Sequence, residues 1–290
     1  MSIDACFWLS AAALGEGDLG VRNDDASGAI APGQGLECID AAFVLTTRSD
    51  HLGVVGDYDR LHAFVSNDPA RWIGVAGIDP TASDAMDDLE RCREIGIRGV
   101  CVSPADQNCR PTSDAFLEVM EWCARHDAPV FVQNPRLYEA RSVLEFASPA
   151  LLDEAARTIP GLRMVIGDLG QLHLDELCSL IAKHPRVFAE TSAIVKHARR
   201  APRVLVEALE RGVMHKLLFG SGYPQISPEV AIERLYGAGS FAAGTGGGGS
   251  VGGVAVPREQ VRAIVERDTL ELLGIELIPE PRTPVETGGA

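Results

Sequence analysis

Positive charge is scarce in this chain of 290 residues. It has 26 Lys and Arg residues against 41 Asp and Glu residues, which gives a formal net charge of −15. An acidic surface repels the phosphates of nucleic acids and the headgroups of anionic lipids. The composition therefore argues against nucleic acid or a membrane as a partner, and it names no substrate.

The sequence also lacks the patterns of exported, membrane and zinc-cluster proteins. No basic segment precedes the short apolar run Ala11–Leu14, which Glu16 soon ends, so neither a signal peptide nor a spanning helix is predicted. Seven cysteines are scattered without a CxxC pair. That spacing is typical of reduced thiols rather than of disulfides or a zinc cluster. We therefore expect a cytoplasmic protein.

What the chain does have is an alternation of short apolar runs and longer amphipathic stretches. Eight runs are typical of strands: Ile3–Leu9, Ala41–Thr46, Trp72–Ile78, Ile97–Val102, Val130–Gln133, Met164–Gly167, Val187–Glu190 and Lys216–Phe219. Segments with apolar residues three or four apart predict helices between and after them: Ala82–Ile95, Asp114–Asp127, Leu151–Thr158, Leu174–Lys183, Val204–Arg211 and Arg258–Leu273. Ser83, Ser113 and Ser148, the last followed by Pro149, stand where helix caps are expected.

This alternation predicts an α/β fold, a (β/α)8 TIM-like barrel in a single domain. An open doubly wound sheet would more often stop at five or six strands and start with a Gly-rich turn, which the sequence lacks. We place the barrel at residues 1–278 and a tail at 279–290. Residues 15–36 lack helical periodicity, so the first crossover helix is expected to be missing. The Gly-rich stretch Gly237–Val256 is expected to be a disordered insertion before the C-terminal helix.

Seven short motifs follow one another along this pattern. They are Gly77–Pro80, Glu94–Val100, Ala128–Val132, Ile159–Leu162, Val165–Gly170, Glu190–Ser192 and Leu218–Pro224. In this order they resemble the amidohydrolase-2 family, which includes metal-dependent hydrolases and decarboxylases of aromatic acids. The resemblance covers the first strand and about residues 40–275. It implies a barrel whose site lies at the C-terminal mouth, and barrels of this kind commonly form dimers.

The resemblance also implies a metal site, but the residues at its positions are changed. Members of the family hold the metal with an HxH pair after the first strand, histidines after the fifth and sixth, and an Asp after the eighth. In this chain those positions fall on Cys6, Trp8, Gln133, Asp168 and Gly222. No histidine stands beside any of them; the nearest, His173, is interpreted as a polar residue near a helix start. We therefore expect a divergent member that holds no metal and no other cofactor.

Other chemistry at the same mouth stays possible on sequence grounds. The candidate catalytic residues are Asp168, Cys6 and Glu190, because a desolvated carboxylate can act as a base and a thiol as a nucleophile. The residues expected to line a ligand pocket are Trp8, Cys101, Gln133, Asp168 and Gly222. Cys6 and Cys101 with a carboxylate would offer an alternative zinc site, although a buried cysteine is more often a small hydrophobe. Trp8 is equally interpreted as a plug that fills the mouth.

Three functional hypotheses follow. In the first, a degenerate barrel acts as a non-catalytic scaffold or regulatory subunit, as a homo-oligomer or paired with an active related barrel. In the second, a metal-independent hydrolase, decarboxylase or lyase acts on a small carboxylate or amide at the C-terminal mouth. In the third, the mouth binds a small molecule without turnover. The changed ligand positions favour the first hypothesis, and the sequence leaves open whether the protein is an enzyme.

Overall fold

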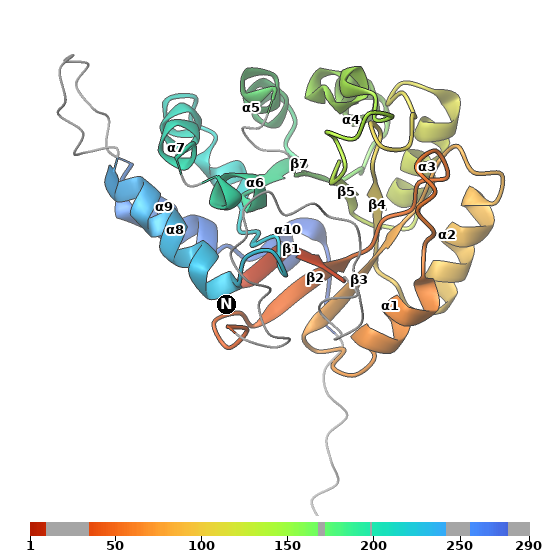
Figure 1. Ribbon diagram of the computed structural model, residues 1–290, viewed down its shortest axis with the longest axis horizontal. Helices are drawn as coiled ribbons and strands as arrows, with labels where there is room; N and C mark the ends of the chain where they lie inside the picture. Colours follow the sequence, from red (N-terminus) through yellow and green to blue (C-terminus); the bar gives the residue numbers. More distant parts are fainter. Residues whose placement is uncertain (10–34, 168–171, 198, 242–255, 278–290) are drawn as a thin grey trace, which may run out of the picture.

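Eight parallel strands form one sheet in the order β1 to β8 (Figure 1). The computed structural model describes residues 1–9, 35–167, 172–197, 199–241 and 256–277. The strands are β1 (Ile3–Trp8), β2 (Ala41–Leu45), β3 (Trp72–Gly77), β4 (Gly99–Val102), β5 (Val130–Val132), β6 (Met164–Ile166), β7 (Val187–Glu190) and β8 (Leu217–Leu218). Each pairs with the next along the chain, as expected for repeated βα units.

Backbone hydrogen bonds join the first strand to the segment after the last. The amide of Ala5 donates to the carbonyl of Phe219 at 2.8 Å, and the amide of Gly222 donates to the carbonyl of Cys6 at 2.9 Å. Further along, Phe7 and Tyr223 form a parallel bridge, and their rings stack with centroids 4.4 Å apart. These contacts close the sheet into a barrel.

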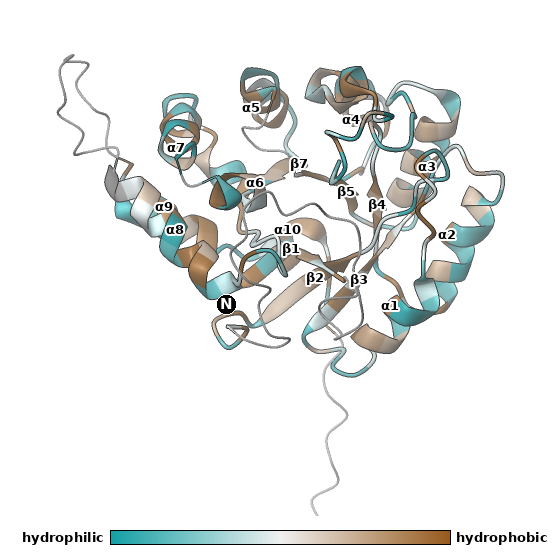
Figure 2. Cartoon of the chain, viewed as in Figure 1, coloured by the Kyte–Doolittle hydropathy of each residue, from teal (hydrophilic) through white to brown (hydrophobic). Residues whose placement is uncertain are grey.

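Helices surround the sheet on its outer side. They are α1 (Tyr58–Val65), α2 (Ala85–Glu94), α3 (Asp114–Arg125), α4 (Asp153–Thr158), α5 (Leu174–Lys183), α6 (Ser192–Lys196), α7 (Ala201–Glu210), α8 (Pro228–Phe241), α9 (Arg258–Val265) and α10 (Thr269–Leu273). Figure 2 shows apolar strands at the centre and polar colour on the outward side of α1 and α2. In α2 the buried residues Ala85, Leu89 and Cys92 recur at helical spacing, so one stripe faces the sheet.

Two apolar cores result from the alternation of side chains along the strands. The outer core lies between strands and helices and includes Val100, Val130 and Met164. The inner core fills the barrel with residues such as Phe43 and Phe131, whose rings lie 5.1 Å apart. Leu270 and Leu273 of α10 join this inner core with the first residue of β1, so α10 closes the N-terminal end and the opposite end remains as the mouth.

The predicted barrel and its eight strands are confirmed, with strand ends shifted by one or two residues. Three helices, α1, α6 and α8, were not predicted. α8 continues to Phe241, so the stretch expected to be flexible from Gly237 is helical over its first five residues, and residues 242–255 lie outside the described ranges. The expected loop at 15–36 and the tail at 279–290 also lie outside them, save Gly35 and Leu36. In the described ranges no helix is long and apolar enough to cross a membrane.

Candidate functional site at the barrel mouth

A register irregularity in β1 brings Cys6 to the mouth of the barrel. The pairing of β1 with β2 shifts between Asp4 and Phe7, so the side chain of Ala5 belongs to the inner core while the next residue, Cys6, also contacts groups at the mouth. Such a shift re-aims a side chain at a strand end. Trp8 follows, partly buried, and packs on the inner core; its roles as a plug or as a pocket residue stay predictions.

Three polar side chains at the mouth each lie over a glycine of a neighbouring segment. A Cβ at Gly167 would lie 1.9 Å from Gln133 Oε1, and a Cβ at Gly220 would lie 2.2 Å from Glu190 Oε2. A Cβ at Gly222 would lie 2.7 Å from Lys196 Cε. The strand ends after β6 and β8 therefore lack side chains where Gln133, Glu190 and Lys196 pack.

Cys6, Gln133, Glu190 and Ser192 are joined by hydrogen-bond contacts, and Lys196 lies beside them at Gly222; we call these five residues the mouth cluster. Gln133 Nε2 donates to Glu190 Oε1 at 3.3 Å and lies 4.0 Å from Cys6 Sγ. Ser192 donates twice to the same carboxylate, from its amide to Oε2 at 2.5 Å and from Oγ to Oε1 at 2.7 Å. The structure thus brings together three predicted residues, Cys6, Gln133 and Glu190, and adds two that the sequence analysis missed.

Burial dominates the electrostatics of this cluster. It raises the pKa of Glu190 to about 7, although hydrogen bonds from Ser192 and Gln133 and the charge of Lys196 act in the opposite direction. Burial, followed by the Glu190 carboxylate, raises the pKa of the Cys6 thiol well above its usual range. A thiolate nucleophile at Cys6 is therefore disfavoured, because burial and the Glu190 carboxylate outweigh the stabilising positive charge of Lys196.

A second buried carboxylate, that of Asp4, holds the junction between β1 and β8. Asp4 Oδ1 accepts from the amides of Cys6 and Ser221, at 2.9 and 3.0 Å, and Oδ2 accepts from Ser221 Oγ at 2.5 Å. Burial raises the pKa of Asp4 to about 6, against these hydrogen bonds. Because all its bonds are to the closing segments, we assign Asp4 a structural role in barrel closure.

The remaining predicted residues either lie apart from the mouth cluster or fall outside the residues that the structure describes. Cys101 is buried in the inner core, and no described contact joins it to Cys6. Asp168 lies outside the described residues. Ser103, which follows β4 and was not among the predicted site residues, is buried, and its Oγ has no partner in the described part of the chain. The ligand-binding roles of Cys101 and Asp168 stay predictions.

The donors at the mouth do not match a divalent metal site. Among the described residues, no three His, Cys, Asp or Glu side chains gather closely enough to hold a metal ion. At the position of the family's last ligand, Gly222 offers no side chain, and the space beside it holds the aliphatic end of Lys196 and the Cβ of Ser192. Within the described ranges, the single carboxylate of Glu190 beside an amide, a neutral thiol and an ammonium group is a poor ligand set for such an ion.

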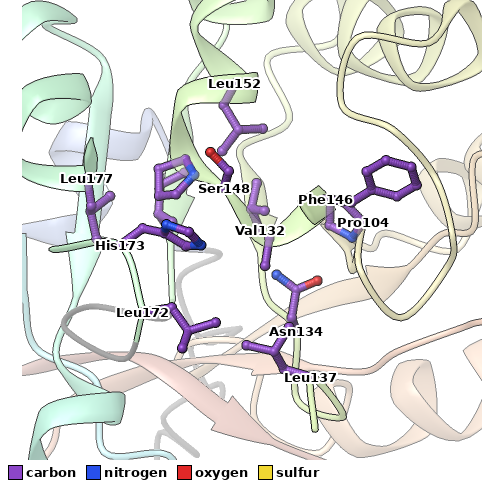
Figure 3. A pocket seen from close by; sticks show the side chains of 13 residues that line it. Pro104, Val132, Asn134, Leu137, Phe146, Ser148, Leu152, Leu172, His173 and Leu177 are labelled. Atoms are coloured by element: carbon purple, nitrogen blue, oxygen red, sulfur yellow. The ribbon is translucent and has the colours of Figure 1, made fainter. Parts of the chain in front are cut away.

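A separate small pocket lies between β5, β6 and α5, on the outer side of the sheet (Figure 3). Its volume is about 20 Å³, enough for about one water molecule. Ser148 and His173 line it, and both contact Glu176: Ser148 Oγ donates at 2.6 Å, and His173 Nδ1 lies 3.6 Å from the carboxylate. A hydrolytic triad needs the imidazole between hydroxyl and carboxylate, so this order does not activate Ser148. His173 is the residue before α5 begins, as interpreted from the sequence.

Comparisons with known proteins agree with this architecture. A probable 2-pyrone-4,6-dicarboxylic acid hydrolase from Acinetobacter baumannii, solved with citric acid bound, is 14% identical; the match covers 94% of this chain and 99% of that one, with a TM-score of 0.63. The 2,6-dihydroxybenzoate decarboxylase from Rhizobium is 12% identical, with 94% and 98% covered and a TM-score of 0.61. The 5-carboxyvanillate decarboxylase from Sphingomonas paucimobilis is 12% identical; the match covers 82% of this chain and 80% of that one, with a TM-score of 0.54. At these identities the likeness shows the fold alone.

Comparison of the sequence with family models shows the family. No curated protein matches it, but a family model described as amidohydrolase matches residues 17–275. That match includes β2 to β8 and the motifs on which the resemblance rests. The chain therefore belongs to the amidohydrolase family.

Proposed function

We propose that this chain is an amidohydrolase-family barrel that works without the family's metal, as a non-catalytic scaffold or regulatory subunit paired with a related barrel. One observation carries the proposal. Polar groups at the mouth bind the protein itself: Gln133 and Ser192 donate to Glu190, while the end of Lys196 fills the space beside Gly222. Groups that satisfy one another are not available to hold a metal or to polarise a substrate.

Burial supports the same proposal. The residues Cys6 and Glu190 are fully buried, each with an exposed fraction of 0%. A catalytic base or nucleophile must come within hydrogen-bond reach of the substrate. Both oxygens of Glu190 already accept hydrogen bonds from the protein, and the raised pKa of Cys6 keeps its thiol protonated. The cluster therefore resembles a stabilised core feature more than an exposed reaction site.

One observation favours a second candidate function, a metal-independent hydrolase, decarboxylase or lyase. The pKa of Glu190, about 7, is the value at which a carboxylate exchanges protons near neutral pH. Such an enzyme would act on a small carboxylate or amide substrate. It would need the mouth cluster to open, since a buried Glu190 cannot reach a substrate.

Isolation of the tagged full chain from its own organism tests the proposal. The proposal predicts that a second barrel of the same family co-purifies, and that the chain alone turns over no member of a panel of aromatic and dicarboxylic acids. Purification of the chain as a lone monomer would contradict the subunit role. Turnover by the chain alone that Glu190→Gln abolishes would establish the second candidate instead. Glu118→Gln, at an exposed carboxylate on α3, is the matched control.

A further inference from the structure

We infer that Lys196 takes the place, in this chain, of the family's last metal ligand and its metal, as a tethered cation that compensates the buried charge of Glu190. The inference deepens the proposed function and rests on it, because it explains how the mouth is stable without an ion. It concerns a residue outside the family's motifs, and the space around Gly222 first points to it.

The position of Lys196 follows from a short helix that the sequence analysis did not predict. α6 begins at Ser192, directly after β7, and ends at Lys196. These two residues are four apart and so lie on one face of the helix. Ser192 uses that face to donate to Glu190, and Lys196, one turn later, lies against Gly222.

Gly222 and Lys196 are complementary. Gly222 has a φ of +70°, and a Cβ built on it would lie 2.7 Å from Lys196 Cε and 3.2 Å from Lys196 Nζ. A distance under 3.0 Å to a Cβ essentially never occurs in proteins, so an Asp at this position would displace the lysine. The end of Lys196 therefore occupies the space where the family's carboxylate would begin, and the flexible lysine would have to shift to make room for it.

The charges agree with an exchange of the ion for the ammonium group. Loss of a divalent cation removes positive charge from the mouth, and the ammonium group of Lys196 supplies a positive charge there. Glu190 is fully buried, and an unpaired buried carboxylate is strongly unfavourable. Lys196 acts on both Glu190 and Cys6 as a nearby positive charge, and it is half-buried at the edge of the mouth.

A double-mutant cycle tests this inference on the full chain. We would measure the melting temperature at about pH 8 for wild type, Lys196→Met, Glu190→Gln and the double variant, since Met keeps the aliphatic volume but removes the charge. Lys196→Met should lower the melting temperature by several degrees. In the Glu190→Gln background the same change should have less than about half that effect, because no buried charge is left to compensate.

Two further variants keep the result decisive. Lys196→Arg retains the charge and should lie closer to wild type than Lys196→Met does. Lys183→Met removes an exposed lysine that pairs with Asp153, and its effect should be equal in both backgrounds. An equal loss for Lys196→Met in both backgrounds overturns the inference. Metal analysis of the same wild-type sample tests the proposed function separately: about one bound metal per chain overturns that function whatever the cycle shows.

Discussion

At the residue scale, Glu190 makes stability depend on pH. Its pKa is about 7 in the folded chain against an ordinary 4.5, so the folded state binds the proton more tightly. Stability from this group is fully present below about pH 4.5 and is lost as the pH rises through about 7. The shift corresponds to at most about 3 kcal/mol.

Glu190→Gln removes the titrating carboxyl group, so the free energy of unfolding should depend less on pH. We expect the free energy of unfolding of wild type to fall between about pH 5 and pH 8, and that of the variant to fall less. Denaturant unfolding at both pH values measures the difference. Asp4 and Asp106 also have raised pKa values, about 6 in each case, caused first by burial, but both remain in the variant. Parallel pH profiles for the two proteins would show that Glu190 is not protonated on folding.

The cysteines give a second prediction at this scale. All seven are free, and of these only Cys38 is exposed. Thiol reagents act on accessible thiolates, so we expect one fast-reacting thiol per native chain, absent in Cys38→Ser. Burial raises the pKa of Cys6 well above its usual range, so its modification should require unfolding. Fast labelling at Cys6, located by peptide mass spectrometry, would indicate an accessible nucleophile at the mouth.

Some residues of the mouth cluster could be predicted from the sequence, and Lys196 could not. The changed ligand positions are those that the family resemblance implies, and three of the predicted site residues, Cys6, Gln133 and Glu190, lie together in the structure. Lys196 could not be found in that way, because its place depends on a short helix and on the absence of a side chain at Gly222. Lys196 and Gly222 are 26 positions apart in the sequence, and local sequence patterns do not encode a contact between such distant residues.

At the element scale, the three serines predicted at helix starts differ in whether they cap a helix. Ser113 precedes α3 and its Oγ accepts from the amide of Phe116 at 3.4 Å, as predicted. Ser83 does not cap α2, whose cap residue is Asp84. Ser148 precedes a short 3-10 helix with Pro149 as its first residue, but its hydroxyl donates to Glu176 instead of capping.

Ser113 and Ser83, one a cap and the other not, form a matched pair for measurement. Ser113→Ala should lower the free energy of unfolding by about 1 kcal/mol, because an amide at the start of α3 loses its partner. Ser83→Ala should change it by less than about 0.5 kcal/mol. Denaturant unfolding of both variants under one condition gives the comparison. Equal losses would mean that the cap hydrogen bond of α3 contributes nothing.

Two of the helices that were not predicted, α1 and α8, have sequence features typical of helices. In α1, Tyr58, Leu61 and Val65 are buried at helical spacing, and Asp57 accepts from the amide of Arg60 as a cap. In α8, Ser227 accepts from the amide of Val230 ahead of the helix. The glycines at 237 and 239 obscured its end: α8 nevertheless continues because Ala238 packs in the outer core, and such packing outweighs low helix propensity.

At the scale of the whole molecule, the fold was predictable and the function was only partly so. Eight strand-like runs, most of them separated by helical stretches, favour a closed barrel, since an open doubly wound sheet more often stops at five or six strands. The family adds the location of the mouth. Neither fixes a reaction, because function depends on the side chains at the site and not on the fold.

The most direct test of the account is the metal content of the purified chain. The full-length protein would be produced with zinc, manganese and iron available, purified without chelator, and analysed by elemental mass spectrometry beside Cys6→Ser and Asp168→Ala. The account predicts close to zero metal per chain in all three proteins, because Lys196 supplies the positive charge at the mouth. About one metal per chain in wild type, lost in either variant, would contradict it and identify a metal enzyme with new ligands.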